Sequence, residues 1–310
     1  MNNLLIAAAM SAALFVGTSV NAKAVDAPLS PGEHDVVIDG TRIHYEVAGH
    51  GPLLVVQAPG WGIGSSYLRK GLKPLEATRT VLTYDPRNSG KSVRVAAPQR
   101  LNTSDMADDL EHLRAAWKLE KIDVLGHSHG GAIALAYAER YPDRVRKLVL
   151  VGGQMIGYSS GAESKAIGEA QKRDPAFAAA YTGPSGPQDN DDQLTAEFRR
   201  TFIVYLHNPA RDASAVAKTL PETMVASSLG AEQIVDGTPQ LHQVEDLHRV
   251  KASTLVIVGR YDIACPPGVS KKMHEGIAGS RMKVLEDSGH FPWAEEPDAF
   301  FGSVTSFLSE

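Results

Sequence analysis

Short apolar runs alternate with longer amphipathic stretches along most of this chain. An apolar run of about four to eight residues between turn-forming residues is typical of a buried strand, and apolar positions three or four apart predict a helix. Apolar runs cover residues 53–58, 80–85, 122–127, 147–153, 254–260 and 281–288, and helices are predicted from residue 65, over 104–117, before Pro142 and after Pro297. Strands that are joined through helices pair in parallel by right-handed crossovers. The pattern predicts an α/β fold with a mostly parallel central sheet and helices on both faces.

The start of the pattern differs from the rest. The runs HDVVI and TRIHYEVAG alternate apolar and polar residues and meet at Asp39-Gly40. An Asp-Gly pair between two alternating runs is typical of a tight β-hairpin. The sheet is therefore expected to begin antiparallel.

The strand pattern stops between about residues 153 and 238. This stretch is rich in Ala, Gly, Pro and polar residues, and it contains helical segments such as DDQLTAEFRRTFIVYLH but no strand pattern. We interpret it as a helical cap, or lid, inserted after the sixth strand. One core is then split into two parts, residues 25–152 and 239–310.

The first 24 residues have the pattern of a signal peptide. An apolar stretch of 14 residues over 4–17 precedes Ala22-Lys23-Ala24, a cleavage site of secretory type. At about 1.5 Å per residue this stretch is too short to cross a bilayer core of about 30 Å. We expect cleavage before Val25 and export, most simply to a bacterial periplasm, with no stable membrane insertion after processing.

Composition places this chain of 310 residues among ordinary globular proteins, with 43% hydrophobic and 22% charged residues. Its formal net charge of −5 and the lack of any basic run argue against nucleic acid as a partner. Cys265, the only cysteine, has no second cysteine to pair with inside the chain. Stability must come from a packed core, and we expect Cys265 to be a small buried residue rather than a reactive thiol.

The stretch LGHSHGG, residues 125–131, joins a predicted strand to a predicted helix. It has Gly-x-Ser-x-Gly spacing from Gly126 to Gly130, with Ser128 at its centre. In this context the turn is so tight that its flanking positions need Gly, and the central residue takes a strained backbone conformation. The serine hydroxyl then stands above the sheet, before the N–H groups and the positive dipole end of the next helix. The spacing predicts a nucleophilic serine.

A serine nucleophile needs a histidine base, and the histidine is oriented by a carboxylate. The first acid after the strand at 254–260 is Asp262, in GRYDIACPP, and the first histidine after the last strand is His290, in SGHFPWAEEP. The chain order Ser, Asp, His is the one expected when the three residues follow successive parallel strands. We therefore predict Ser128, Asp262 and His290 as a catalytic triad.

These motifs, together with QAPGWGIGSS, YDPRNSGKS and GHSHGGAIALAYAERYPDRVRKLVLV, make the chain similar to α/β-hydrolase-fold serine hydrolases over essentially the whole expected mature sequence. The YDPRNSGKS segment and the place of the lid resemble most closely the proline iminopeptidase-like members, which cleave amino-terminal residues from peptides. The resemblance implies cleavage of an ester, lactone, thioester or amide bond in a small molecule through an acyl-enzyme, and it leaves open a C–C bond next to a carbonyl. It implies neither a metal nor an organic cofactor.

Two positions depart from the pattern of this family. Relatives usually have His-Gly after the third strand, where this chain has Ala58-Pro59 followed by Gly60-Trp61. We assign the oxyanion hole to the backbone N–H of His129 and to a second donor at Gly60 or Trp61. Members of the peptidase group also tend to have Trp after the nucleophile, where this chain has His129.

Three shorter patterns suggest other chemistry. His127-x-His129 offers two common zinc ligands, but alternation along a strand points neighbours in opposite directions, and no other ligand cluster accompanies the pair. Residues 60–64 resemble a dinucleotide-binding loop whose third glycine comes one position early. Residues 89–92 resemble the end of a phosphate loop, yet Asp85 stands where its first glycine belongs. We expect His127 to pack beside the turn and His129 to line the pocket floor.

The segment YDPRNSGKS follows the strand at 80–85. We expect Asp85 and Arg87 to hold this loop through hydrogen bonds rather than to do chemistry. Asn88 is expected at a turn position with positive φ, which Asn tolerates.

Substrate choice is expected to depend on the lid. An aminopeptidase must pair the ammonium group of its substrate with a buried carboxylate, because an isolated buried charge is costly, and Glu197 and Glu222 are the candidates. A pocket for an acyl group is the other interpretation, and its candidate residues are Trp61, Phe198, Phe202, Tyr205 and Met224. Both substrate classes stay open, as does a receptor or carrier that binds a small molecule with little turnover.

Overall fold

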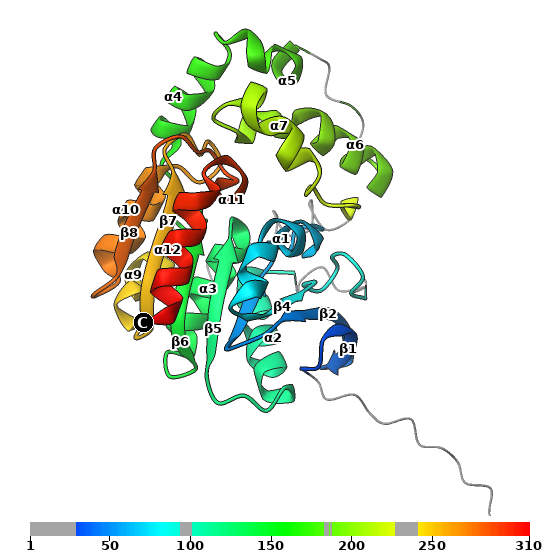
Figure 1. The fold of residues 1–310 in the computed structure, drawn as a ribbon, viewed down its shortest axis with the longest axis vertical. Helices are drawn as coiled ribbons and strands as arrows, with labels where there is room; N and C mark the ends of the chain where they lie inside the picture. Colours follow the sequence, from blue (N-terminus) through cyan, green and yellow to red (C-terminus); the bar gives the residue numbers. More distant parts are fainter. Residues whose placement is uncertain (1–28, 94–100, 183–185, 187, 227–240) are drawn as a thin grey trace, which may run out of the picture.

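The computed structural model describes residues 29–93, 101–182, 186, 188–226 and 241–310 (Figure 1). The signal peptide expected over residues 1–24 lies outside these ranges, and so does the end expected for the lid at residue 238. Both boundaries therefore stay predictions.

The strands of the described chain form one eight-stranded sheet with the order β1-β2-β4-β3-β5-β6-β7-β8. β2 pairs antiparallel with β1 and with β4, and all other pairs are parallel. The predicted sheet, mostly parallel with an antiparallel beginning, is confirmed. The strands are β1 Gly32–Ile38, β2 Thr41–Gly49, β3 Leu53–Gln57, β4 Thr80–Tyr84, β5 Ile122–His127, β6 Val145–Val151, β7 Ser253–Gly259 and β8 Arg281–Leu285.

The first two strands meet at the predicted hairpin turn. Asp39 has φ of 46° and Gly40 has φ of 74°, so both central residues are left-handed. This is the conformation that a two-residue type I′ turn needs, and Asp-Gly adopts it readily.

Helices cover both faces of the sheet (Figure 1). The α-helices are α1 Ser66–Gly71, α2 Thr103–Ala116, α3 His129–Arg140, α4 Gly161–Gln171, α5 Ala178–Thr182, α6 Asp191–Thr201, α7 Pro209–Ala217, α9 Gln243–Asp246, α10 Pro267–Gly276, α11 Pro292–Glu295 and α12 Pro297–Ser309. Short 3₁₀ helices are η1 Lys73–Ala77, η3 Pro175–Phe177, η4 Phe202–Tyr205 and η5 Leu247–Arg249.

Successive residues of a central strand pack on opposite faces, as the 2-residue period of a strand requires. In β6, Leu148 and Leu150 belong to the core that includes residues of α2, α3 and α10. Val149 and Val151 belong to the core that includes residues of α1 and α12. This explains why the predicted strands are continuously apolar rather than alternating.

Helices α4, α5, α6 and α7 follow β6, the sixth strand, within residues 153–238 that are expected to form the lid, and they lie above the sheet in Figure 1. Asparagine side chains begin two of these helices. The side chain of Asn190 accepts a hydrogen bond from the backbone N–H of Gln193, and that of Asn208 from the N–H of Arg211. These contacts satisfy N–H groups that the helix itself leaves without a partner.

The loop after β4 is held by the residues expected to hold it. The Arg87 guanidinium is buried and forms a two-pronged ion pair with Asp109 of α2, with 2.5 Å between Nε and Oδ2. Asn88 has φ of 60°, as predicted. Asp85 accepts three hydrogen bonds, described below.

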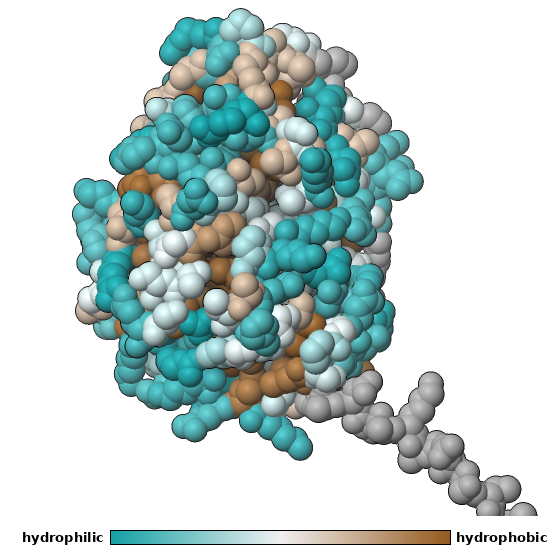
Figure 2. Space-filling model, viewed as in Figure 1, coloured by the Kyte–Doolittle hydropathy of each residue, from teal (hydrophilic) through white to brown (hydrophobic). Residues whose placement is uncertain are grey.

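No helix in the described ranges is both long and apolar enough to span a membrane. On the face that Figure 2 shows, hydrophilic side chains cover most of the surface, and hydrophobic ones lie in separate areas between them. The apolar residues of the sheet and its helices are mostly inside.

We expect Arg87→Met to lower the free energy of unfolding by about 3–5 kcal/mol, because the substitution leaves the Asp109 carboxylate buried without its cation. Equilibrium unfolding in urea measures this effect. The double variant Arg87→Met/Asp109→Leu should lose less, since it leaves no buried charge. A single variant within about 1 kcal/mol of the wild type would contradict this account of the loop.

Candidate active site

The chain turns sharply at Ser128, between β5 and α3. Ser128 has φ of 57° and ψ of −128°, an unfavourable conformation for a residue with a side chain. A Cβ at Gly126 would lie 2.3 Å from the carbonyl oxygen of Gly130, and one at Gly130 would lie 2.3 Å from that of Gln57. Both glycines of the motif are therefore required by backbone contacts, as expected.

The backbone of Ser128 is fixed by its neighbours. Its N–H donates to the carbonyl oxygen of Val151 (3.2 Å), and its own carbonyl oxygen accepts from Gly131 and from Gln154 (2.9 Å each). Three hydrogen bonds hold the strained residue in place, and they link the turn to β6 on one side and to α3 on the other.

Asp262 and His290 meet as predicted. His290 Nδ1 donates to Asp262 Oδ2 at 2.7 Å, and Asp262 Oδ1 accepts from the N–H groups of Ala264 (3.0 Å) and Cys265 (2.8 Å). The Asp262 side chain is fully buried. Because an ionised carboxylate only accepts, it fixes the proton of the imidazole on Nδ1 and leaves Nε2 available as an acceptor.

Ser128 and His290 line one cavity of about 200 Å³. Its walls are mainly aromatic and apolar, and they come from the loop after β3, from the lid and from the loops after β5, β7 and β8. Among the residues predicted to bind substrate, Trp61, Phe198 and Tyr205 line this cavity. The turn, the imidazole and its carboxylate thus lie at the edge where the parallel strands end.

Phe202, which was also predicted to contact substrate, is not among the described residues that line the cavity, so that contact stays a prediction. Phe202 is buried in the core that also contains Leu206 and Phe291. Met224 is buried as well and forms an isolated β-bridge with Ile63. Both belong to the packing that holds the lid on the core, which sequence patterns do not distinguish from a pocket wall.

His127 packs beside the turn as expected, whereas His129 does not line the pocket floor. His127 lines the cavity, whereas His129 is fully buried and does not. His127 Nε2 donates to the carbonyl oxygen of His290 (2.9 Å), and its Nδ1 accepts from the Tyr67 hydroxyl (2.7 Å). Burial, and then the neighbouring His290, lower the pKa of His127 well below its usual value, so this imidazole stays neutral.

The His129 side chain holds the loop after β3. Its Nδ1 donates to the carbonyl oxygen of Pro59, its Nε2 accepts from the Thr103 hydroxyl (2.8 Å), and its ring stacks on Trp61 with centroids 4.7 Å apart. His127 and His129 therefore face different partners. No cluster of three or more metal-ligating residues occurs within the described ranges.

The loop after β3 has an unusual backbone over three successive residues. Gly60, Trp61 and Gly62 have φ of 73°, 53° and 74°. A Cβ at Gly62 would lie 2.3 Å from the carbonyl oxygen of Val225, so the loop passes close to the lid backbone. The ring of Trp61, stacked on His129, keeps this loop beside the turn at Ser128.

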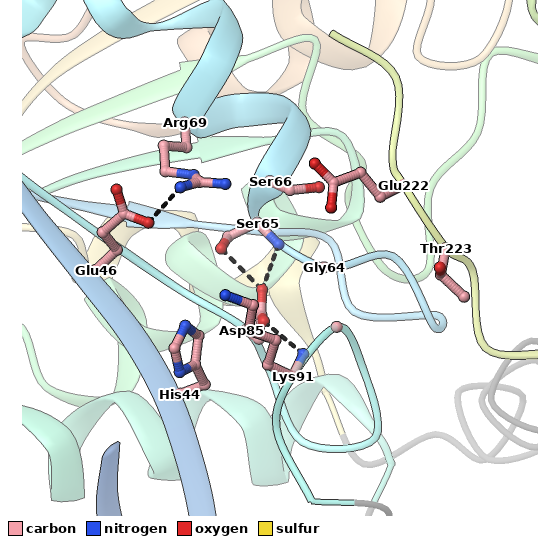
Figure 3. A pocket seen from close by; sticks show the side chains of 11 residues that line it. His44, Glu46, Gly64, Ser65, Ser66, Arg69, Asp85, Lys91, Glu222 and Thr223 are labelled. Carbon is pink, nitrogen blue, oxygen red and sulfur yellow. Dashed lines mark hydrogen bonds and ion pairs between the residues drawn. The ribbon is translucent and has the colours of Figure 1, made fainter. Parts of the chain in front are cut away.

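Asp85 ties this loop to the one after β4. It accepts hydrogen bonds from the N–H (2.6 Å) and hydroxyl (2.8 Å) of Ser65 and from the N–H of Lys91 (2.7 Å), as Figure 3 shows. Around it lies a separate polar pocket of about 170 Å³, in which Arg69 pairs with Glu46. The predicted structural role of Asp85 is confirmed.

Neither glutamate considered as an ammonium partner lines the main cavity. Glu197 pairs with Arg200 of the same helix (2.6 Å). Glu222 pairs with Lys70 (2.8 Å) and lines the polar pocket instead. Arg200 and Lys70 lower the pKa values of these two carboxyls, which stay ionised and paired with these cations.

Several lining residues were missed by sequence analysis, among them Tyr67, Gln154, Pro221 and Phe291. Gln154 follows β6, at the same edge as the predicted triad, so its position in the chain was a usable signal. Cys265 is buried, as expected, and burial raises the pKa of its thiol well above the usual value. It also lines the cavity as a small wall residue.

A sequence profile of the family described as alpha/beta hydrolase fold matches residues 53–297. The chain belongs to the α/β-hydrolase fold family. This match spans both parts of the core and the lid between them, and it confirms the resemblance inferred from the motifs.

Two relatives show the range of activities among similar chains. The proline iminopeptidase PfmaB of Pestalotiopsis fici is 26% identical over 284 residues, which cover 89% of this chain and 99% of that protein. The 2-hydroxymuconate semialdehyde hydrolase of Pseudomonas sp. (strain CF600) is 27% identical over 290 residues, covering 89% of this chain and 93% of that protein. The two relatives are hydrolytic enzymes that are named for different substrates.

Among solved structures, the esterase EaEST from Exiguobacterium antarcticum is similar in fold. Its TM-score is 0.67 at 24% identity, with 91% of this chain and 100% of that chain covered. This similarity agrees with the α/β-hydrolase fold.

We expect Gly130→Ala to destabilise the α/β-hydrolase core by about 1–3 kcal/mol, because the added methyl group would overlap the backbone of Gln57 and Ala58. Gly161→Ala is the matched control, since a Cβ there meets nothing within 4 Å near the start of α4. Urea unfolding of both variants compares the two sites. Equal stability of the two variants would mean that the turn accommodates the methyl group with little loss in the free energy of unfolding.

Proposed function

We propose that this protein is a serine hydrolase that cleaves a carboxylic ester or lactone bond of a small neutral substrate, with Ser128 as the nucleophile. The observation that carries the proposal is that Ser128 and His290 line one cavity, with the His290 imidazole bonded to the buried Asp262 carboxylate. A strained serine at a strand-to-helix turn is the usual setting for this chemistry on a parallel sheet.

The proposed reaction uses the three residues in sequence. His290 Nε2 takes the proton of the Ser128 hydroxyl as Oγ attacks the substrate carbonyl, and Asp262 stabilises the imidazolium that forms. The imidazolium then gives this proton to the leaving alcohol, and the acyl group stays on Oγ. In the second half, His290 activates a water molecule that hydrolyses the acyl-enzyme and restores the serine.

The oxyanion of the tetrahedral intermediate would lie at the N-terminus of α3. The backbone N–H of His129 is the first amide of this helix, whose dipole favours negative charge there. We assign the second donor to Trp61 rather than Gly60, because Trp61 lines the cavity and stacks on His129. Each such donor contributes roughly 100- to 1000-fold to the rate.

A neutral substrate fits this cavity better than an aminoacyl peptide. None of the described residues that line it is Asp or Glu, while Trp61, Ile63 and Phe198 offer apolar surface. A free ammonium group there would lose its hydration without gaining a counter-charge. This favours ester or lactone cleavage, although several relatives are named proline iminopeptidases.

We also propose that the protein is exported after loss of residues 1–24, on the strength of the apolar leader and its Ala-x-Ala site. Expression of the full chain in a bacterium, followed by mass determination of material from the periplasm, tests this. A chain that begins at Val25 supports export. A cytoplasmic chain that keeps Met1 would overturn it.

The test of the chemistry is a substrate panel with wild type and Ser128→Ala. We expect short-chain esters and lactones to be hydrolysed, and the alanine variant to lose at least about 1000-fold in kcat, since no other nucleophile replaces the hydroxyl. A fluorophosphonate probe should label wild type and not Ser128→Ala. Folded wild type that neither labels nor turns over would instead indicate a binding protein.

The neutral character of the cavity can be tested by Gln154→Glu. If the missing counter-charge excludes aminoacyl amides, this substitution should raise the ratio of kcat/KM for proline arylamide to that for a short ester. About 1.4 kcal/mol of added charge pairing would give about tenfold. The ratio cancels any general loss of activity. An unchanged ratio, or wild type that already prefers the arylamide, would reject the neutral-substrate proposal.

A further inference from the structure

The loop that carries His290 has three successive backbone N–H groups with unusual partners. Those of Gly289 (2.9 Å) and Phe291 (3.0 Å) donate to the two carboxylate oxygens of Glu295. That of His290 itself donates to the carbonyl oxygen of Tyr205, in the lid (2.7 Å). The backbone on both sides of the imidazole is thus held by one carboxylate, and its centre by the lid.

The same carboxylate also holds the lid. Glu295 Oε2 accepts a third hydrogen bond from the N–H of His207 (2.8 Å). Residues 205–207, here called the lid clamp, pack so closely that a Cβ at Gly289 would lie 2.2 Å from the Tyr205 carbonyl oxygen. No side chain other than hydrogen fits between the lid clamp and the loop of His290.

The lid clamp reaches the acid of the proposed triad as well. The His207 ring stacks on that of Tyr261, with centroids 3.7 Å apart and planes 11° apart. Tyr261 directly precedes Asp262. One short lid segment therefore contacts the loops that carry both partners of the serine.

Burial of a carboxylate costs free energy unless hydrogen bonds or charges compensate it. The Glu295 side chain is buried, and the hydrogen bonds found for its two oxygens come from three backbone N–H groups. An amide side chain offers a single acceptor oxygen, and its NH₂ group would face an N–H donor. Only the carboxylate matches all three donors.

We propose that Glu295 is a positioning residue that couples the lid to the base, so that the His290 imidazole is aligned only while the lid clamp, residues 205–207, is bonded to its carboxylate. The proposal rests on the proposed function of His290 as the catalytic base. Glu295 does not itself touch the reacting atoms.

The charge of Glu295 responds to pH near neutrality. Burial is the main cause that raises its pKa from 4.5 to about 7, against the three N–H groups, which lower it. The other titratable and charged groups around it are Arg211 and Asp212 of α7, His207 of the lid clamp, and Asp287, His290 and Glu296 of its own loop.

Two quantities should therefore change in opposite directions with pH. A carboxyl whose pKa is raised in the folded state stabilises the fold most below pH 4.5, and this contribution is lost as pH rises through about 7. Over the same range the ionised carboxylate gains the capacity to accept all three bonds. Alignment of the loop should improve while this contribution to global stability falls.

The test compares Glu295→Gln with Glu286→Gln by hydrogen exchange and mass spectrometry on the full folded protein. Glu286 is an exposed carboxylate of the same loop that pairs with Arg260 (2.7 Å), so it matches the change in charge. We expect Glu295→Gln to speed exchange by about tenfold or more in peptides 203–208 and 287–293 together, and not in β5 or β6. Glu286→Gln should leave both peptides as in wild type.

Activity gives a second readout. Glu295→Gln should lower kcat on a short ester about 10- to 100-fold, as expected for a misplaced base, with a smaller change in KM. Glu286→Gln should stay within about twofold of wild type. Below about pH 7, wild-type exchange in the two peptides, corrected for intrinsic rates, should approach that of Glu295→Gln.

Exchange and kcat that stay at wild-type values in Glu295→Gln would overturn the proposal. If that variant does not fold, Gly289→Ala separates the same surfaces without removing the carboxylate, and it should speed exchange in both peptides or the proposal fails. Exchange does not depend on turnover. A protein without esterase activity but with coupled exchange would reject only the proposed function.

Discussion

Close contacts at the turn between β5 and α3 restrict the backbone to one conformation. Gly126 and Gly130 touch carbonyl oxygens so closely that neither tolerates a Cβ, and Ser128 is forced to a φ of 57°. The strain persists because hydrogen bonds to Val151, Gly131 and Gln154 determine the position of the residue from both sides. All other loops at this edge of the sheet are arranged around the hydroxyl that this turn presents.

Much of this arrangement could be predicted from the sequence, because the carboxyl ends of parallel strands lie at the same edge of the sheet. Each apolar run is a strand buried on both faces, and the first acid or histidine after a strand end must lie at the same edge as Ser128. Asp262 and His290 were found in this way, and their 2.7 Å contact agrees with it. Asp85 and Arg87 were expected to hold the loop after β4 through hydrogen bonds, and their contacts agree with this expectation.

The sequence did not predict side-chain positions in two situations: where a residue can face either side of a turn, and where two residues of one segment can both face the cavity. His127 and His129 flank a turn at which the chain changes from strand to helix, so alternation along the strand no longer says which ring faces the cavity. Phe202 and Phe198 lie four residues apart in the lid, and only the packing of the lid on the core separates a wall of the cavity from its support. The sequence pattern did not predict the role of Glu295, because the partners of its carboxylate are backbone N–H groups.

The lid is inserted into the chain between β6 and α9, and the side chains of Phe198 and Pro221 in it line the cavity. Phe198 and Pro221 can therefore be exchanged in evolution to suit new substrates without any change in the sheet. Tyr205 and His207 differ, since their main-chain atoms bond the loop of His290 and the carboxylate beneath it. Insertions or deletions in this fold should thus accumulate on either side of residues 205–207 and spare the three residues themselves.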